Sequence, residues 1–285
     1  AEFILQQTRM ETGIRYFHSL LKKFPTIEAL AAAREEYVLA AWSGLGYYRR
    51  ARSLHATCRA IVAKHGGKVP SAPDALITLP GIGPYTAGAI ASIAYDRPAT
   101  SLDGNQIRVL SRLLGTRDPT RTRAQKTISS FALDLVKAGS PRIINQALMD
   151  LGSAVCLPET PRCGACPLAR GCRSRGRIER RRAAAAPGPV EYWAADLWTR
   201  GEKTWLVGPR GGGVLGDLWM PPLRRLRAAR PGPALRHAFS HKTWIVTPVR
   251  KRGEPSGNGR WVAPAQLVGL PHSALTKRLM AWRED

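Results

Sequence analysis

Leu79-Pro80-Gly81-Ile82-Gly83 is a loop-forming stretch between two segments with helical patterning. The first segment, residues 71–79, begins with Ser71 as a candidate N-cap, and the second, residues 84–94, begins with proline. Two glycines allow a sharp turn that exposes backbone N–H groups at a helix N-terminus, where a phosphate oxygen can bind without any side chain. The stretch therefore predicts either a phosphate-binding helical hairpin or an ordinary helix–helix turn.

The charge of the chain favours a polyanionic partner. The 285 residues carry a net charge of +24, with 28 basic and 13 acidic residues up to Arg182, and 16 and 7 after it. Because both parts are basic, one charged tail is not the source, and we expect nucleic-acid binding rather than a merely solvated surface. No run of apolar residues is long enough to cross a membrane, and the chain does not start with a signal peptide. We expect a bacterial protein that is cytoplasmic, associated with the nucleoid, monomeric and without a membrane partner.

The patterning predicts a mainly α chain with a smaller α+β domain at its C-terminus. Apolar residues recur at helical spacing from residue 3 to about 154, and Pro and Gly breaks divide this region into short helices. Residues 176–189 are basic and then rich in Ala, Pro and Gly, which is typical of a linker. Short β-like runs follow at 205–207, 238–239 and 243–246, with a final helix around 274–282.

Four cysteines, Cys156, Cys163, Cys166 and Cys172, are spaced C-x6-C-x2-C-x5-C. Disulfides are disfavoured in a cytosolic chain, so the pattern is typical of a metal site. Only one pair has the C-x2-C spacing common in zinc sites, and four thiolates also suit a [4Fe-4S] cluster. The spacing alone leaves zinc and the cluster equally open. Cys58, which lies in a predicted helix, is expected to be a buried small hydrophobe.

Together these motifs resemble one enzyme superfamily. The cysteine pattern, placed after the 79–83 turn and after Leu102-Asp103-Gly104-Asn105, is similar to that of the endonuclease III superfamily of base-excision DNA glycosylases. The resemblance covers residues 1 to about 175. It implies a helix-hairpin-helix glycosylase fold, with the hairpin at about 71–94 binding DNA through Gly81 and Gly83. It also implies a [4Fe-4S] cluster on the four cysteines that is structural and DNA-sensing.

Within that superfamily the chain resembles the adenine-specific, MutY-type branch. The lyase branch has a catalytic lysine two residues after the second hairpin glycine, whereas this chain has Tyr85. The opening residues 1–8, Ala-Glu-Phe-Ile-Leu-Gln-Gln-Thr, match the adenine branch, in which Glu2 replaces a glutamine. Two rival readings stay open: an endonuclease III-like pyrimidine-lesion glycosylase and lyase, and a catalytically impaired Fe–S DNA-binding protein. The second rival is kept because the family carries a further helical segment before the position of Glu2.

The resemblance implies a monofunctional hydrolysis in which Glu2 protonates the departing adenine and Asp103 stabilises the sugar cation. Glycoside hydrolysis likewise uses two carboxyl groups, and its general acid increases the reaction rate about 10²–10⁴-fold. Tyr85 would face the same cation, and Asn105 would orient water or a carboxylate. Each residue also has a simpler interpretation, because Glu2 could be a surface carboxylate, Asp103 a helix N-cap, Tyr85 a packing residue and Asn105 a capping partner.

The expected substrate is duplex DNA with A:8-oxoguanine or A:G mispairs, from which adenine must be extruded. Gln7, Leu45, Gly46 and Tyr47 match positions that press into the opened base stack. In residues 190–285, Phe239-Ser240-His241 resembles the loop of the adenine branch that contacts 8-oxoguanine, where a hydroxyl group can both donate and accept. Gly216–Pro222 resembles a segment of the Nudix-like fold. The glutamate-rich Nudix box is missing, so nucleotide hydrolysis and its Mg²⁺ are not expected.

Overall fold

The structure is a computed structural model that describes residues 1–116, 118–175, 188–209 and 215–283. The chain forms two compact units: one holds Ala1 with residues 3–55 and 185–285, and the other holds Glu2 with residues 56–184. From residue 3 onward, the chain passes between the two units at two places, one of which is between residues 184 and 185. The other place is between residues 55 and 56, inside helix α5, where the sequence has no Gly or Pro that would predict a boundary. Most of the expected linker, residues 176–187, lies outside the described residues.

The N-terminal helices are α1 (Glu2–Leu5), α2 (Met10–Lys23), α3 (Ile27–Ala32), α4 (Glu35–Ala41) and α5 (Tyr48–His65). Thr26 begins α3 by accepting a 3.1 Å hydrogen bond at Oγ1 from the Ala29 N–H. Val38 and Trp42 are almost completely buried, at 0% and 1% exposure, as their helical spacing predicts. The apolar face of α4 and its C-cap residue are therefore buried.

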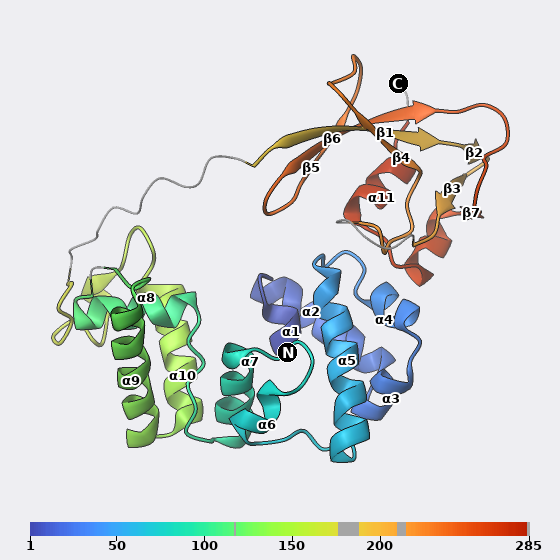
Figure 1. Ribbon diagram of the computed structural model, residues 1–285. Helices are drawn as coiled ribbons and strands as arrows, with labels where there is room; N and C mark the ends of the chain where they lie inside the picture. The colour runs from blue at the N-terminus through green and yellow to red at the C-terminus, as the bar shows by residue number, and fades with distance from the viewer. Residues whose placement is uncertain (117, 176–187, 210–214, 284–285) are drawn as a thin grey trace. The chain divides into compact units, whose positions relative to one another are not determined.

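The unit formed by residues 56–184 is helical throughout its described part (Figure 1). Its helices are α6 (Pro73–Ile77), α7 (Pro84–Ala89), which continues as the π-helix η1 (Ile90–Ala94), α8 (Gly104–Leu114), α9 (Thr122–Ala138) and α10 (Pro141–Asp150), which continues as the π-helix η2 (Leu151–Val155). The 3-10 turn η3 (Cys163–Ala165) follows. Leu110, Ile128 and Leu148 form the centre of a core between α8, α9 and α10. The expectation of a mainly α fold is confirmed.

The first helix of the hairpin, Pro73–Ile77, is shorter at both ends than the predicted span of residues 71–79. The first helix begins at Pro73 with Ala72 as its N-cap, so the expectation that Ser71 caps it is wrong. Proline at the first helical position fixes φ and needs no N–H partner, which explains why the helix starts there rather than at the serine. The second helix begins at Pro84, as expected, and the π-turn carries it to Ala94.

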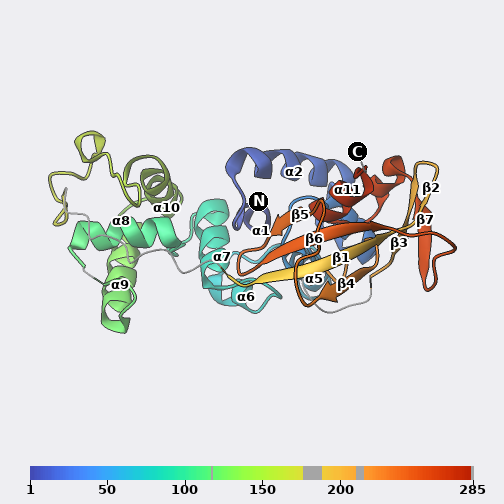
Figure 2. The same cartoon turned by 90° about the horizontal axis from the view of Figure 1, so that it is seen from above.

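The C-terminal residues form two sheets and a helix. The strands are β1 (Val190–Leu197), β2 (Thr199–Arg200), β3 (Lys203–Val207), β4 (Leu223–Leu226), β5 (Leu235–Ala238), β6 (Thr243–Arg250) and β7 (Gly259–Val262). One sheet has the order β4-β1-β6-β5, with β1 and β6 parallel, and the other has the order β2-β3-β7 (Figure 2). The short turn η4 (Pro264–Gly269) and helix α11 (Ala274–Met280) follow. Leu275 and Leu279 of α11 pack on Val246 of the larger sheet, so this part is α+β as expected.

The first unit joins the two ends of the chain by specific polar contacts. Ser43 Oγ donates a 3.1 Å hydrogen bond to the Leu270 carbonyl oxygen and accepts one of 3.1 Å from the His272 N–H. The Tyr48 hydroxyl donates to the His272 carbonyl oxygen. Arg52 forms a 2.7 Å ion pair with Asp217. The C-terminal sheets therefore belong to the same compact unit as α4 and the start of α5.

No described helix has the length and apolar character needed to cross a membrane.

Candidate active site

Three predicted catalytic side chains, those of Glu2, Tyr85 and Asp103, lie together in the second unit. The Tyr85 hydroxyl lies within electrostatic reach of the carboxylates of both Glu2 and Asp103. Burial, followed by the two carboxylates, raises the pKa of Tyr85 well above its ordinary value of 10.0. Tyr85 is therefore a neutral phenol near pH 7 and acts as a hydrogen-bond donor between two acids.

Asp103 also begins helix α8. Its Oδ1 accepts a 2.7 Å hydrogen bond from the Gln106 N–H, so the N-cap interpretation of this residue is correct. The carboxylate therefore lies at the positive end of the helix dipole. Because the cap uses one oxygen of the group, it is compatible with a substrate-directed role for the other.

A buried polar network fixes the segment that leads to Asp103. Asn145 Oδ1 accepts hydrogen bonds from Ser101 N (3.1 Å) and Ser101 Oγ (2.9 Å), and Gln106 Nε2 donates to the Asn145 carbonyl oxygen at 2.9 Å. Gln106 and Ser101 have 0% exposure. A Cβ atom at Gly88 would lie 1.8 Å from the Thr100 carbonyl oxygen, so α7 packs directly on this segment. Sequence reasoning missed Ser101 and Gln106, although a glutamine on the apolar face of a predicted helix was an available signal.

Asn105 is tied to the cysteine loop through Arg108. Asn105 Oδ1 accepts a 2.9 Å hydrogen bond from Arg108 Nη2. The Nε of the same arginine donates a 2.9 Å hydrogen bond to the Cys156 carbonyl oxygen. Arg108 also binds the Gly152 carbonyl oxygen at 2.7 Å. Asn105 thus follows Asp103 on α8, but in this structure its partner is an arginine. The role predicted for Asn105 toward water or a carboxylate stays a prediction.

The two segments predicted to press into DNA are held by one buried arginine. Gln7 and Tyr47 have φ angles of 54° and 49°, in the left-handed region that residues other than glycine rarely adopt. Arg50, 8% exposed, lies with its guanidinium carbon 5.2 Å from the centroid of the Tyr47 ring. Its donors reach the carbonyl oxygens of Phe3 (3.2 Å), Ile4 (2.9 Å), Gln6 and Gly46 (3.4 Å) and the Thr8 hydroxyl (3.1 Å). Sequence reasoning missed Arg50 because it stands in a run of arginines that resembles a basic surface.

Leu45 and Gly46 complete the second of these segments. Gly46 has a φ of 75° and Leu45 is half-buried, whereas Tyr47 is 49% exposed. The Trp42 indole N–H donates a 3.0 Å hydrogen bond to the Gly46 carbonyl oxygen. The backbone therefore presents an exposed tyrosine from a turn whose base is tied to the core.

The hairpin glycines have the geometry that the turn requires. Gly81 has a φ of 74°, and Gly83 is the N-cap of α7 without a side-chain cap. Ile82, between them, is 6% exposed and anchors the turn. Both glycines are exposed and have no side chain, so no side chain of the turn caps the N-terminus of α7.

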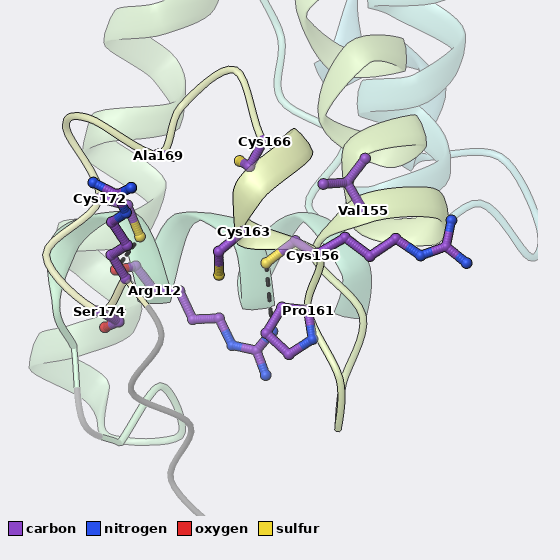
Figure 3. Close-up of a pocket in the computed structure, with 11 residues that line it drawn as sticks. Arg112, Val155, Cys156, Pro161, Cys163, Cys166, Ala169, Cys172 and Ser174 are labelled. Atoms are coloured by element: carbon purple, nitrogen blue, oxygen red, sulfur yellow. Dashed lines mark hydrogen bonds between the residues drawn. The ribbon is translucent and has the colours of Figure 1, made fainter.

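The four clustered cysteines surround one cavity of about 40 Å³ (Figure 3). All four are free thiols of intermediate exposure, whereas Cys58 is buried, as expected. Arg112 Nη1 lies 3.4 Å from Cys156 Sγ and also binds the Leu157 carbonyl oxygen at 2.6 Å. Within the described part of the chain, no three His, Cys, Asp or Glu side chains come close enough together to hold a metal ion.

A second cavity, of about 340 Å³, opens beside Tyr85. It lies between the start of α7, the segment before Asp103 and helix α9, and its lining includes Leu102, Gln125 and Ser129. Its volume falls in the range of about 300–1,000 Å³ found for small-ligand pockets. Sequence reasoning did not anticipate Gln125 or Ser129, because nothing in α9 distinguishes them from solvent-facing polar residues.

Phe239, Ser240 and His241 form the turn between β5 and β6. Ser240 and His241 are exposed, and Phe239 is half-buried with its ring edge-on to that of Trp244. The three residues lie in the first compact unit, and the carboxylate site lies in the second.

Comparisons with known proteins show that the chain is similar to DNA repair proteins. Residues 1–132 match the family model of the HhH-GPD superfamily of base excision DNA repair proteins. The chain also resembles a thermostable thymine-DNA glycosylase (TM-score 0.57, 26% identity, 61% of this chain and 81% of that one). The helical part of the chain has the HhH-GPD fold. A non-covalent endonuclease III–DNA complex shares this HhH-GPD fold (TM-score 0.52, 26% identity, 61% of this chain and 81% of that one).

Several curated proteins that are similar to this chain are adenine DNA glycosylases. The rat protein is 43% identical over 70% of this chain and 39% of its own length. The human protein is 43% identical over 63% of this chain and 33% of its own length, and that of Mycolicibacterium smegmatis is 41% identical over 61% and 59%. This chain is therefore a homologue of adenine DNA glycosylases, but it spans only about two fifths of the length of the rat relative.

Proposed function

We propose that this chain is an adenine DNA glycosylase of base excision repair, which hydrolyses the N-glycosidic bond of adenine in duplex DNA. The observation that carries the proposal is the convergence of two carboxylates, Glu2 and Asp103, on the neutral hydroxyl of Tyr85. Glycoside hydrolysis needs one acid for the leaving group and one anion for the sugar cation. The identity to adenine DNA glycosylases of rat and human supports the choice of base.

In the proposed reaction Glu2 protonates the adenine ring at N7 while the glycosidic bond stretches. Asp103 stabilises the oxocarbenium-like sugar from its place at the N-terminus of α8. Tyr85 donates its hydroxyl proton as a hydrogen bond and does not transfer it, because the raised pKa keeps the phenol intact. Asn105 orients the water that completes hydrolysis to an abasic site.

The adenine must leave the base stack before the carboxylates can act, at a cost of about a few kcal/mol. Gln7, Leu45, Gly46 and Tyr47 are the groups that we propose to enter or support the opened stack. Gly81 and Gly83 would hold a phosphate through backbone N–H groups. The net charge of +24 supports DNA as the partner.

We further propose that the base opposite the adenine is 8-oxoguanine and that Phe239, Ser240 and His241 contact it. The exposure of Ser240 and His241 at the tip of a turn supports this role. The serine hydroxyl can accept a hydrogen bond from the N7–H and donate one to O8, the two groups that distinguish 8-oxoguanine from guanine.

Cys156, Cys163, Cys166 and Cys172 would hold a [4Fe-4S] cluster. Their arrangement around one cavity supports four ligands for one group. A cubane cluster spaces its thiolates farther apart than a single ion does, so it fits thiols that do not meet at one point. The cluster would supply structural order to the loop and no step of bond cleavage. Iron and sulfide analysis of the purified protein tests this directly, with four irons per chain as the expected result.

Single-turnover assays on three duplexes test the function. We expect base release from A:8-oxoguanine and A:G duplexes and none from a thymine-glycol duplex. Glu2→Gln should lose about 10²–10⁴-fold in rate because it removes the general acid. Strand cleavage without added base should be absent, since Tyr85 offers no amine for a Schiff base. Release from the thymine-glycol duplex alone would overturn the proposal in favour of a pyrimidine-lesion enzyme, and binding without release from any duplex would indicate an impaired DNA-binding protein.

A further inference from the structure

The turn that carries Ser240 and His241 is a tight β-hairpin. Phe239 N donates a 2.8 Å hydrogen bond to the Lys242 carbonyl oxygen, which closes the turn between β5 and β6. Both ends of the turn therefore meet at Phe239 and Lys242. Any group that fixes the side chains of these two residues also fixes the two exposed residues between them.

A single half-buried carboxylate lies beneath this turn. The Glu191 side chain, on β1, is only 16% exposed. Its Oε2 accepts hydrogen bonds from Trp244 Nε1 at 2.7 Å and Trp193 Nε1 at 3.3 Å, and its Oε1 accepts one from Lys242 Nζ at 3.3 Å. Arg225 lies 3.9 Å away on the neighbouring strand β4. The carboxylate thus joins β1, β4 and β6 at the point where the turn begins.

Two of these partners reach the turn itself. Lys242 is the residue that closes the hairpin, and its ammonium group is held by Glu191. The Trp244 ring lies edge-on to the Phe239 ring, with 4.9 Å between centroids, and Phe239 in turn meets His237 at 4.7 Å. Fixing the Trp244 indole therefore fixes the ring against which Phe239 packs.

The backbone on the other side of the turn allows little adjustment. A Cβ atom at Gly188 would lie 1.9 Å from the His241 carbonyl oxygen, and Thr243 N donates a 3.0 Å hydrogen bond to the Pro189 carbonyl oxygen. The chain just before β1 consequently passes directly against the turn. Glu191 lies three residues after Gly188, in β1, and contacts the turn through Lys242.

The charge state of Glu191 suits this role. Burial opposes ionisation, but the hydrogen bonds from Lys242 and Trp244 outweigh it, so the pKa of Glu191 lies below its ordinary value. The group is a carboxylate at neutral pH. Replacing it by an apolar side chain would leave two indole N–H groups and an ammonium group without their acceptor.

We propose that Glu191 is a positioning residue that holds the Phe239-Ser240-His241 turn in the geometry that reads the base opposite the adenine. The inference rests on the proposed function, in which this turn contacts 8-oxoguanine. Glu191 itself does not touch the base. It acts through Lys242 and through the packing of Trp244 on Phe239.

The test measures selectivity rather than activity alone. Single-turnover rates of adenine release are compared for A:8-oxoguanine and A:G duplexes in the full chain. Glu191→Gln keeps the shape but loses the charge and one acceptor, and should lower the 8-oxoguanine preference about tenfold, the equivalent of one charge-assisted hydrogen bond. Trp244→Phe keeps a ring against Phe239 but loses the N–H donor, and should lower the preference in the same direction. The rate on A:G should change little in both variants, because the carboxylate site is in the other unit.

Matched variants separate the possible failures. Glu254→Gln removes an exposed carboxylate of the same domain that pairs with Arg200, and should leave the preference unchanged. Ser240→Ala tests the proposed reading of 8-oxoguanine directly. If Ser240→Ala lowers the preference and Glu191→Gln does not, the positioning role is wrong and the proposed function stands. If neither variant lowers it, the turn does not read this base and both ideas fail. An equal loss on both duplexes would show that Glu191 supports folding only.

Discussion

At the scale of single residues, Asp103 combines a structural and a chemical role that different substitutions separate. Asp103→Asn keeps an oxygen that accepts from the Gln106 N–H, so we expect thermal stability close to that of the parent chain. It removes the charge, so adenine release should fall by at least about 10²-fold. Asp103→Ala removes the cap as well and should cost about 1 kcal/mol of stability. Thermal unfolding and single-turnover rates measure the two effects. Equal stability of the two variants would contradict the capping role.

Tyr85 should not ionise at the ordinary pH of a phenol. Its pKa is raised by burial and by the carboxylates of Glu2 and Asp103, so the folded state retains the proton more strongly than the unfolded chain does. The resulting stabilisation is fully present below the ordinary pKa of 10.0 and is lost as the pH rises above it. The difference in phenolate absorbance between the parent chain and Tyr85→Phe measures this. A Tyr85 transition at or below pH 10.0 would show that the carboxylates do not face it.

At the scale of elements, Arg50 links α1 to the 43–47 turn. Arg50→Lys keeps the charge but not the planar fork that reaches several carbonyl oxygens, and each lost charge-assisted bond costs roughly 1.5–3 kcal/mol. We expect faster amide hydrogen exchange in residues 2–8 and 43–47, with little change in α9. Arg49 directly precedes Arg50 and is exposed, so Arg49→Lys is the matched control and should leave the exchange rates unchanged. Unchanged exchange in both segments would show that Arg50 does not hold them.

The elements that the sequence predicted best are those whose signals are local. Apolar periodicity located α5, proline at the first turn located the start of α7, and β-branched and aromatic runs located β3 and β6. Strand β1 was assigned no run of its own, because its alanines carry little strand signal and its pairing partners lie far along the chain. The same limit applies to the site. Resemblance supplied Glu2 and Asp103, but the network of Ser101, Gln106 and Asn145 and the contacts of Arg50 and Glu191 exist only after distant segments meet.

At the scale of the whole molecule, the net charge of +24 predicts binding that depends strongly on salt. Neutralised phosphates release counterions, so the logarithm of the association constant should fall linearly with the logarithm of salt concentration. Fluorescence anisotropy with a labelled duplex, titrated at several salt concentrations, measures the slope. A matched pair of A:8-oxoguanine and fully paired duplexes should give similar slopes, because backbone contacts carry no sequence information. A slope near zero would indicate that the basic residues do not meet the DNA backbone.

Residues 3–55 and 185–285 belong to one compact unit, so a mutation that removes part of the second stretch should also affect the first. A stop codon placed before the codon for Leu270 would remove the carbonyl oxygens at Leu270 and His272 that receive hydrogen bonds from Ser43 and Tyr48. This loss would then affect the segment beside Arg50, which binds the backbone of the helix that bears Glu2. Nonsense alleles of this kind should behave as losses of excision and not merely as losses of mispair preference.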